Sequence, residues 1–330
     1  MPVPVTESTL SASYLAQFIA YQYSLGDDVS CSLLRTGMNH LYLVKNREIK
    51  FVFRIYTLNW RTKEEIAEEQ RLLVMLKNNQ IPVSYPVPDK SDQYIQEIDA
   101  PEGLRYGVLF SFAEGSKNPR LAAQSCYHIG KIMARMHSVT VNFAMRRVNY
   151  NADILLREPI KQVHSLFSSE SPERNFIDRL ADHLYKELKG IKEAEVQKGI
   201  VHLDLWFDNI HFRNEEDITI FDFDFCGNGW LVMDISFFLH QLLVTNPNEQ
   251  DYNEKAAKFL DGYETIKKLT DEERRIIPVL SLAIMVFYFG VQCIKFETWS
   301  NIFMNEDHFK RYVGMLKRWM EFHKITLEEH

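Results

Sequence analysis

The segment between Val201 and Asp224 constrains this chain more than any other. It reads VHLDLWFDNIHFRNEEDITIFDFD and contains the spacing His-x-Asp-x-x-x-x-Asn, followed by an apolar run that ends on a second aspartate. Transfer of a phosphoryl group from ATP to a hydroxyl requires a carboxylate that orients the nucleophile and oxygen-bearing side chains that hold Mg²⁺. Asp204 fits the first role, and Asn209 and Asp222 fit the second.

The expected local geometry brings the two metal ligands together. We expect a hairpin of two strands joined by a four-residue turn, residues 214–217. Arg213 then faces Ile218 and, counting outward two residues at a time, Asn209 faces Asp222. Directly opposed residues have Cβ atoms roughly 5 Å apart, which is close enough to share one cation. A slip of one residue would put the two side chains on opposite faces.

The alternative is that these three residues are ordinary loop and turn residues, because Asp and Asn favour such positions for local hydrogen-bonding reasons. The motif spacing alone is a weak signal. Its placement after the apolar segment 199–201, the hairpin that follows and an aspartate at the strand end together favour the catalytic interpretation.

The chain resembles the group formed by aminoglycoside phosphotransferases, choline kinases and type II homoserine kinases, small-molecule kinases with a protein-kinase-like fold. The residues that carry the resemblance are His202, Asp204, Asn209, Asp222, Gly227, Gly229 and Asp234. The resemblance implies ATP and Mg²⁺ as cofactors, Asp204 as the catalytic aspartate, Asn209 and Asp222 as metal ligands and Asp234 as a brace of the catalytic loop. Two positions depart from the family pattern: Leu203 replaces a glycine, and Asp208 replaces a small residue.

The resemblance and the order of predicted elements indicate an α+β, bilobal, protein-kinase-like fold. Residues 1–113 form a small β-rich N-terminal lobe that binds nucleotide, and residues 114–330 form a larger, mostly helical lobe that carries catalysis and the acceptor site. The hinge lies at about 111–115. A chain of 330 residues, 46% of them hydrophobic, can bury the core that two lobes require.

Several N-terminal residues are candidates for nucleotide binding. The turn from Arg35 to His40 contains Gly37 and Asn39 and could place backbone N–H groups near phosphates, although a plain hairpin turn is the alternative. In the strand 50–56, alternation puts Arg54 on a basic face, where its planar fork could grip phosphates.

A helix glutamate should pair with Arg54. Glu69 matches that position, Glu68 is its rival, and a solvent-facing charge is the ordinary alternative for either one. At the hinge, we expect backbone groups of Ser111 to Ala113 to contact adenine, as in similar enzymes.

The acceptor site is the least specified part. Trp206, Asp208 and Asp224 lie close to the catalytic carboxylate in the sequence and are candidate contacts, with packing and loop hydrogen bonding as the alternatives. The C-terminal region is rich in aromatic residues, most of which we expect in the core. They include Phe259, Tyr263, Phe287, Tyr288, Phe289, Trp299, Phe303, Phe309, Tyr312, Trp319 and Phe322.

Charge and segment composition limit the partners. The net charge is −7, without a long block of one sign, so nucleic acid is not an expected partner. Residues 276–294 lack charges over nearly the length of a membrane span, but we interpret them as a buried helix that begins with the capping pattern at 270–273. No secretory signal or metal-type cysteine spacing is visible. We therefore expect a cytoplasmic enzyme, monomeric or homodimeric, without a membrane partner.

Together, these features predict an ATP- and Mg²⁺-dependent phosphotransferase that acts on a hydroxyl of a small molecule, such as an amino alcohol, a hydroxy amino acid or an antibiotic. Two alternatives remain. One is a catalytically silent nucleotide-binding protein that acts through protein interactions. The other is a protein kinase, against which the sequence Asp222-Phe223-Asp224 lacks the glycine of the D-F-G motif.

Overall fold

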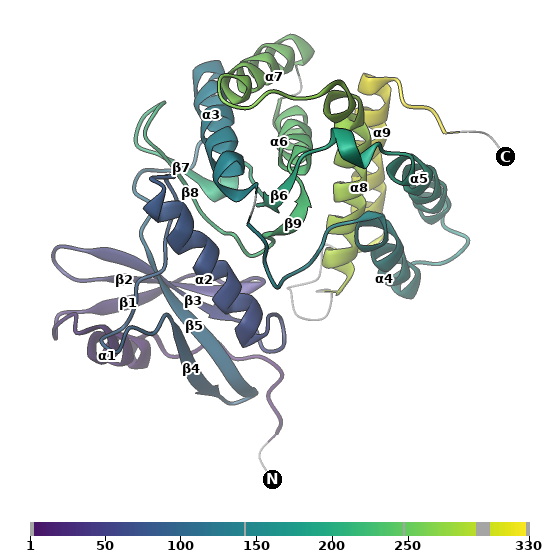
Figure 1. Ribbon diagram of the computed structural model, residues 1–330. Coiled ribbons are helices and arrows are strands. Elements are labelled where there is room, and N and C mark those ends of the chain that lie inside the picture. The colour runs from purple at the N-terminus through teal and green to yellow at the C-terminus, as the bar shows by residue number, and fades with distance from the viewer. Residues whose placement is uncertain (1–2, 142, 247, 295–303, 328–330) are drawn as a thin grey trace. The chain divides into compact units, whose positions relative to one another are not determined.

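A computed structural model of the chain describes residues 3–141, 143–246, 248–294 and 304–327. The chain divides into two compact units (Figure 1). The N-terminal unit comprises Met1–Glu114 and Thr219–Phe221, and the C-terminal unit comprises Gly115–Ile218 and Asp222–His330. The sequence placed the boundary one residue earlier and did not anticipate that three residues of the later hairpin group with the N-terminal unit. The expected combination of a β-sheet region followed by a helical region is confirmed.

The N-terminal unit is built on one antiparallel sheet in the order β1-β2-β3-β5-β4. Its strands are β1 (Ser30–Arg35), β2 (Asn39–Lys45), β3 (Lys50–Tyr56), β4 (Ile95–Ala100) and β5 (Gly103–Ser111). Two helices accompany the sheet, α1 (Ala12–Tyr23) and α2 (Lys63–Asn78). The connection between β1 and β2 is shorter than expected, because Arg35 and Asn39 already belong to the strands.

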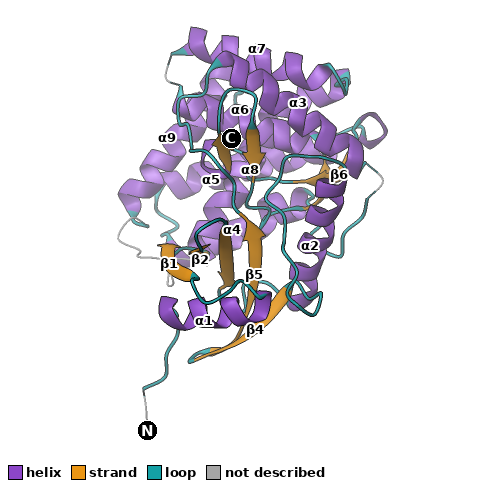
Figure 2. Cartoon of the chain, turned by 90° about the vertical axis from the view of Figure 1, so that its left-hand side faces the viewer, coloured by secondary structure: helices purple, strands orange, loops and turns teal. Residues whose placement is uncertain are grey.

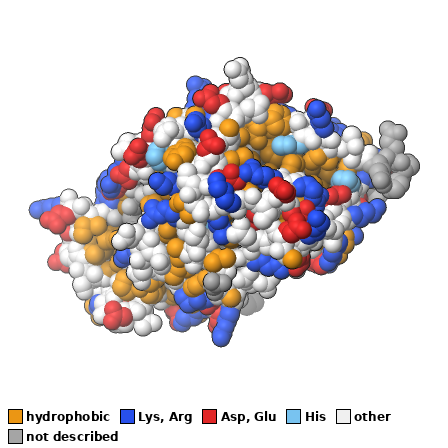
Figure 3. Space-filling view, turned by 45° about the horizontal axis from the view of Figure 1, so that its top comes forward, with side chains coloured by type: hydrophobic (Ala, Val, Ile, Leu, Met, Phe, Trp, Pro, Cys, Tyr) orange, Lys and Arg blue, Asp and Glu red, His pale blue; other side chains and the backbone are white. Residues whose placement is uncertain are grey.

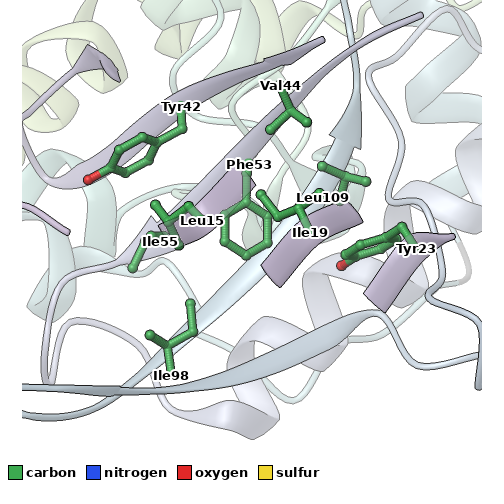
Figure 4. Close-up of a cluster of buried hydrophobic side chains, with 9 residues drawn as sticks. All are labelled: Leu15, Ile19, Tyr23, Tyr42, Val44, Phe53, Ile55, Ile98 and Leu109. Atoms are coloured by element: carbon green, nitrogen blue, oxygen red, sulfur yellow. The ribbon is translucent and has the colours of Figure 1, made fainter. Parts of the chain in front are cut away.

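Alternation along β3 places its side chains on the two faces of the sheet, as the sequence predicts. Phe53 and Ile55 are fully buried and form a core with Leu15 and Ile19 of α1. In Figure 4, the Phe53 ring lies at the centre of this cluster. Arg54 therefore points to the opposite face, where α2 supplies its partner. This arrangement places a basic residue at a fixed position on one face of the sheet.

Helix α2 begins with a capping box. The Thr62 hydroxyl accepts from the Glu65 backbone N–H, and the Glu65 carboxylate accepts from the Thr62 N–H. These two bonds satisfy backbone donors that the first helical turn leaves unpaired.

The C-terminal unit is mostly helical (Figure 2). Its α-helices are α3 (Ala123–Thr140), α4 (Glu158–Leu166), α5 (Pro172–Lys189), α6 (Val232–Thr245), α7 (Glu249–Glu264), α8 (Asp271–Ile294) and α9 (Glu306–His323), with single-turn helices η1 (Asp153–Arg157), η2 (Glu193–Glu195) and η3 (Phe207–Asn209). Trp299 and Phe303 of the expected aromatic set lie outside the described residues. On the face drawn in Figure 3, acidic and basic side chains are interspersed.

Helix α8 is long and apolar enough to cross a membrane, but 72% of its most apolar window is buried inside the protein. It packs against α4, α5, α6 and α9, which makes it a core helix. It begins with the expected capping box, in which Thr270 and Glu273 exchange side chain-to-backbone bonds of 3.0 Å.

The chain also forms two short sheets, β6 (Lys198–Val201) with β9 (Gly227–Trp230) and β7 (Ile210–Phe212) with β8 (Ile218–Ile220). The expected register is wrong, because the Arg213 N–H donates to the carbonyl of Asp217 at 3.0 Å, so Arg213 does not pair with Ile218 and the hairpin does not place Asn209 opposite Asp222. The two side chains are instead related through Asp204, which Asn209 contacts by a hydrogen bond and Asp222 influences by its charge. The Asn214 side chain accepts from the backbone N–H groups of Glu216 and Asp217 at 2.9 Å, which closes the loop one residue earlier.

Helices α3 and α7 cross at two glycines that allow their backbones to touch. A Cβ atom added to Gly130 would overlap the carbonyl oxygen of Phe259, and one added to Gly262 would overlap the carbonyl oxygen of Tyr127. The contact is therefore reciprocal, and neither helix can accommodate even a methyl group without moving away from the other.

Gly130→Ala and Gly262→Ala should each lower the free energy of unfolding by roughly 1–3 kcal/mol, because the added methyl group overpacks a backbone contact. Gly314→Ala on α9 is the matched control. Its added Cβ meets no atom within 4 Å, so the higher helix propensity of alanine should raise stability by about 0.5–1 kcal/mol. Urea unfolding of the three variants measures these values, and equal effects at all three positions would contradict the close helix crossing.

A buried histidine lies where α6, α8 and α9 meet. His240 is fully buried, its Nδ1 bonds the Ser281 hydroxyl at 2.8 Å, and its ring packs on Trp319. Its Nε2 has no hydrogen-bond partner among the described residues. Burial, reinforced by the nearby charge of His323, lowers the pKa of His240 to about 3.

Stability should therefore fall on acidification below about pH 6.5, the ordinary pKa of histidine. The unfolded chain binds a proton at His240 below that pH, whereas the folded chain resists protonation down to about pH 3. The contribution of His240 is thus complete above pH 6.5 and is lost as the pH falls, by at most about 1.4 kcal/mol per pH unit. Urea unfolding at pH 7, 6 and 5 should show a flatter dependence in His240→Gln, whereas His183→Gln, a partly exposed control on α5, should keep the wild-type slope.

Candidate active site

The loop after β6 is held by a single buried carboxylate on α6. The backbone N–H groups of His202 and Leu203 donate to Asp234 Oδ2 and Oδ1 at 2.9 and 2.7 Å. Asp234 has no exposed surface. Because a buried charge is tolerated only when it is well hydrogen-bonded, these bonds fix the entry of the loop relative to α6. The geometry matches the bracing role that the family resemblance implied for Asp234.

A buried histidine on α3 completes this arrangement. His137 Nε2 lies 3.0 Å from Asp234 Oδ2, and its Nδ1 lies 2.9 Å from the Tyr263 hydroxyl. The simplest assignment has Nε2–H donating to the carboxylate and the tyrosine hydroxyl donating to Nδ1. Sequence analysis could not single out His137, because its partner lies 97 residues away along the chain.

Leu203 adopts a left-handed backbone conformation with φ of 64°. This is the position where the family pattern has glycine, and an L-residue with a side chain pays about 1–2 kcal/mol for that conformation. The Leu203 side chain is fully buried, so apolar burial offsets part of the cost. The bond from its N–H to Asp234 holds the strained conformation in place.

The proposed base and one proposed metal ligand are in direct contact. The Asn209 side-chain Nδ2 donates to the Asp204 backbone oxygen at 2.9 Å and to its Oδ2 at 2.8 Å. Asn209 is buried at the end of η3, whereas Asp204 is half-buried. The amide nitrogen is thereby committed to Asp204, and the oxygen of the same amide points away from that contact.

The electrostatic setting of Asp204 is that of a perturbed carboxyl group. Burial raises its pKa well above the usual range, the charge of Asp222 raises it further, and Asp224 adds a smaller contribution of the same sign. Interactions with the Tyr288 hydroxyl and the Asn209 amide oppose this rise. Strongly perturbed acids of this kind are typical of catalytic sites.

The residues present fit a divalent cation. Asn209 and Asp222 offer an amide oxygen and a carboxylate, which are the hard oxygen ligands that Mg²⁺ prefers. A cation held by Asp222 would also relieve the repulsion between this residue and Asp204. Within residues 3–141, 143–246, 248–294 and 304–327, no three His, Cys, Asp or Glu side chains converge as a metal site. Bound phosphate oxygens would therefore have to complete the coordination.

The three candidate acceptor contacts have different surroundings. The Asp208 carboxylate forms a 2.6 Å ion pair with Lys117. Trp206 is half-buried and packs against Phe207 at a ring distance of 4.7 Å. Asp224 is almost fully buried. Of the three, Asp224 lies close enough to Asp204 to influence its charge.

In the N-terminal unit, Arg54 and Glu69 form a buried ion pair. Arg54 Nη1 lies 3.0 Å from Glu69 Oε1, with 7% and 1% of the two side chains exposed. The Tyr56 hydroxyl donates to the other carboxylate oxygen at 3.0 Å. Glu68 instead pairs with Arg71 at 2.7 Å. The contacts therefore favour Glu69 over Glu68 as the partner of Arg54.

The other candidate nucleotide contacts in this unit are less well supported. Asn39 lies in β2, and its side-chain oxygen accepts from the Thr57 N–H at 3.4 Å, which gives it a structural role. Gly37 lies in the turn between β1 and β2, where an added Cβ would meet nothing closer than a distance of 4.0 Å. The turn therefore does not require a glycine for steric reasons.

The backbone of Ser111 is already engaged. Its N–H donates to the Tyr85 carbonyl at 2.8 Å, and its carbonyl accepts from the Ser84 hydroxyl at 2.6 Å. The single N–H of Ser111 is thereby used, whereas its carbonyl oxygen keeps a second lone pair and could still accept a bond from adenine. Ala113, two residues further along, is buried and remains the candidate at the expected hinge.

Comparison with known proteins defines the class. Amicoumacin kinase hAmiN, in complex with AMP-PNP, Ca²⁺ and Ami, has a TM-score of 0.77 at 21% identity and covers 96% of this chain and 98% of its own. The microcompartment-associated aminopropanol kinase has a TM-score of 0.73 at 19% identity, with 96% and 99% covered. The expected protein-kinase-like fold is thereby confirmed, and fold and site together define a phosphotransferase.

The family follows from the sequence match. The model of the phosphotransferase enzyme family matches residues 33–269, well over half of the chain, so the protein belongs to that family. A homoserine kinase of Bradyrhizobium diazoefficiens is 26% identical over 274 residues, which are 82% of this chain and 81% of that protein. The protein is thus a phosphotransferase of this family.

Leu203→Gly should be more stable than Leu203→Ala by about 1 kcal/mol, although glycine usually destabilises folded proteins relative to alanine. Both variants lose the same buried side chain, and both should be less stable than wild type by roughly 2–5 kcal/mol before any relief of strain. Glycine alone relieves the left-handed conformation. Chemical denaturation of the two variants measures the difference, and a more stable alanine variant would show that the backbone is not strained here.

Proposed function

We propose that the protein is an ATP- and Mg²⁺-dependent kinase of a small hydroxyl-bearing metabolite, with an amino alcohol or a hydroxy amino acid as the first acceptors to test. The observation that carries this proposal is the contact between Asp204 and Asn209, beside Asp222. Asp204, whose pKa is raised, is hydrogen-bonded to Asn209 and lies near the charge of Asp222, and these are the two side chains that would hold the metal.

Asp204 acts as the general base. It accepts the proton of the acceptor hydroxyl as the acceptor oxygen forms a bond to the γ-phosphorus, while the bond from this phosphorus to the β–γ bridging oxygen breaks and ADP leaves. The hydrogen bonds from Asn209 keep one carboxylate oxygen in place, so the other can face the acceptor.

Asn209 and Asp222 would hold the metal, and Mg²⁺ bound there would offset charge on the β- and γ-phosphates. In the N-terminal unit, Arg54 contacts the phosphate tail of ATP, and Glu69 keeps its guanidinium in position through the 3.0 Å ion pair. Ala113 supplies the hinge contact to adenine, and the Gly37 turn lies against the phosphates. The bracing of the loop by Asp234 keeps the base fixed.

The acceptor class is suggested by the relatives. The homoserine kinase and the aminopropanol kinase are named for substrates that carry both a hydroxyl and an amino group. The net charge of residues 241–330 is only −2, so these residues give no charge-based reason to expect a polycationic aminoglycoside. Trp206 and Asp224 are the candidate acceptor contacts, whereas the ion pair of Asp208 with Lys117 favours a structural role for that carboxylate.

Asp204→Asn should reduce kcat by roughly 10²–10⁴, the usual contribution of a general base, and should leave ATP binding near the wild-type level. ADP release measured with L-homoserine, 1-amino-2-propanol and a panel of hydroxylated antibiotics tests the rate, and calorimetry tests ATP affinity. Asp208→Asn is the matched control, because it removes a neighbouring carboxylate outside the proposed chemistry and should keep most of the activity.

Two results would contradict the proposal. Retained turnover in Asp204→Asn would remove the assigned base, and the absence of both ATP hydrolysis and acceptor phosphorylation in the wild type would favour the silent nucleotide-binding alternative. Phosphorylation of protein substrates in preference to the small-molecule panel would favour the protein kinase alternative.

A further inference from the structure

The hydroxyl of Tyr288 on α8 reaches the loop that carries the proposed base. It donates to the Leu203 carbonyl oxygen at 3.3 Å and also interacts with the carboxylate of Asp204. The sequence identified Tyr288 only as one of many C-terminal aromatic residues. We infer that Tyr288 is a positioning residue that fixes the orientation of the Asp204 carboxylate toward the acceptor hydroxyl, an inference that rests on the proposed function.

Two elements then hold the carboxylate. Asn209, at the end of η3, bonds Asp204 Oδ2 and its backbone oxygen. A contact at one oxygen still permits the carboxylate to swing about that contact, so a second contact from another element is needed to fix its plane. Tyr288 supplies a constraint from α8 through its bond to the carbonyl of Leu203, the residue that precedes Asp204. Catalytic groups must be held close to their productive geometry by partners that are themselves fixed, and this pair of contacts meets that requirement.

The hydroxyl has one proton and two acceptors within reach. A neutral tyrosine donates only one hydrogen bond, so Leu203 and Asp204 compete for it. A charged carboxylate is the stronger acceptor, and 3.3 Å is long for a bond between a hydroxyl and a carbonyl oxygen. In this structure the hydroxyl donates to the Leu203 carbonyl, and the Asp204 carboxylate lies close enough to compete for the same proton.

The Tyr288 ring is fixed independently of its hydroxyl. It packs against Phe225 at 5.1 Å, Phe237 at 5.2 Å and Phe287 at 5.6 Å between ring centroids. Aromatic pairs at such distances stabilise one ring arrangement. Removal of the oxygen atom alone should therefore leave the ring in place, which makes Tyr288→Phe a clean test of the hydroxyl.

Tyr288→Phe should lower kcat by roughly tenfold to a hundredfold, the usual cost of a misplaced catalytic group, with an unchanged KM for ATP and a near-normal melting temperature. Tyr312→Phe is the matched control. It removes another buried hydroxyl, which donates to the Met285 carbonyl of α8 at 2.6 Å, and should lower stability while it leaves kcat unchanged. A merely structural role of Tyr288 would give both variants the same pattern, so wild-type kcat in Tyr288→Phe would overturn the inference.

A second readout separates this inference from the proposed function. Wild-type turnover of L-homoserine or 1-amino-2-propanol, or ATP hydrolysis without an acceptor, is measured first. If the wild type shows none of these, the proposed function fails. Tyr288 is then judged from crystal structures of wild type and Tyr288→Phe grown in the same condition. A rotated Asp204 carboxylate in the variant supports the positioning role, and an unchanged carboxylate refutes it.

Discussion

The catalytic part of this protein depends on the buried carboxylate of Asp234, which binds the chain by its backbone. It accepts from the backbone N–H groups of His202 and Leu203, so the course of the loop is fixed by atoms that every residue type except proline would carry at these positions. His137 supplies a further partner to the charge. Removal of any member would leave a buried charge or donor unsatisfied, which is expensive in a protein interior. Because Asp234 binds backbone atoms and not side chains, a leucine can replace glycine in the left-handed conformation while the loop keeps its geometry.

The N-terminal unit also positions a charged group, the Arg54 guanidinium, through a buried ion pair. Arg54 lies on a central strand, and its guanidinium is held by Glu69 of α2 and covered by the aromatic ring of Phe110 at 4.9 Å. The strand fixes the backbone of Arg54, Glu69 fixes the direction of its guanidinium group, and the Phe110 ring restricts the movement of that group. In each unit, a buried carboxylate on a helix thus holds a neighbouring segment in place: Asp234 of α6 holds the loop after β6, and Glu69 of α2 holds Arg54.

Local chemistry was predictable from the sequence, and distant partners were not. The spacing of Asp204 and Asn209 identified a pair that proves to be in contact, and the alternation along β3 correctly oriented Arg54. The hairpin was wrong by one residue, because a side-chain bond from Asn214 shortens the turn, and propensity rules do not capture such a bond. Strand β9 was missed because its sequence, GNGW, lacks the β-branched residues that indicate strands. The contacts of Tyr288 could not be predicted, because they join segments 85 residues apart.

Helix α8 touches the polypeptide at both ends of the segment 197–203, which leads to Asp204. Near its start, Glu273 accepts from the Gln197 N–H just before β6 at 2.9 Å, and four turns later Tyr288 meets the Leu203 carbonyl. The two contact points are separated by about 22 Å along the helix axis at 1.5 Å per residue. The helix therefore fixes the distance between these two contact points. One inserted residue between these points would turn the tyrosine by about 100° away from the loop, so the two contacts together fix the number of residues in this segment.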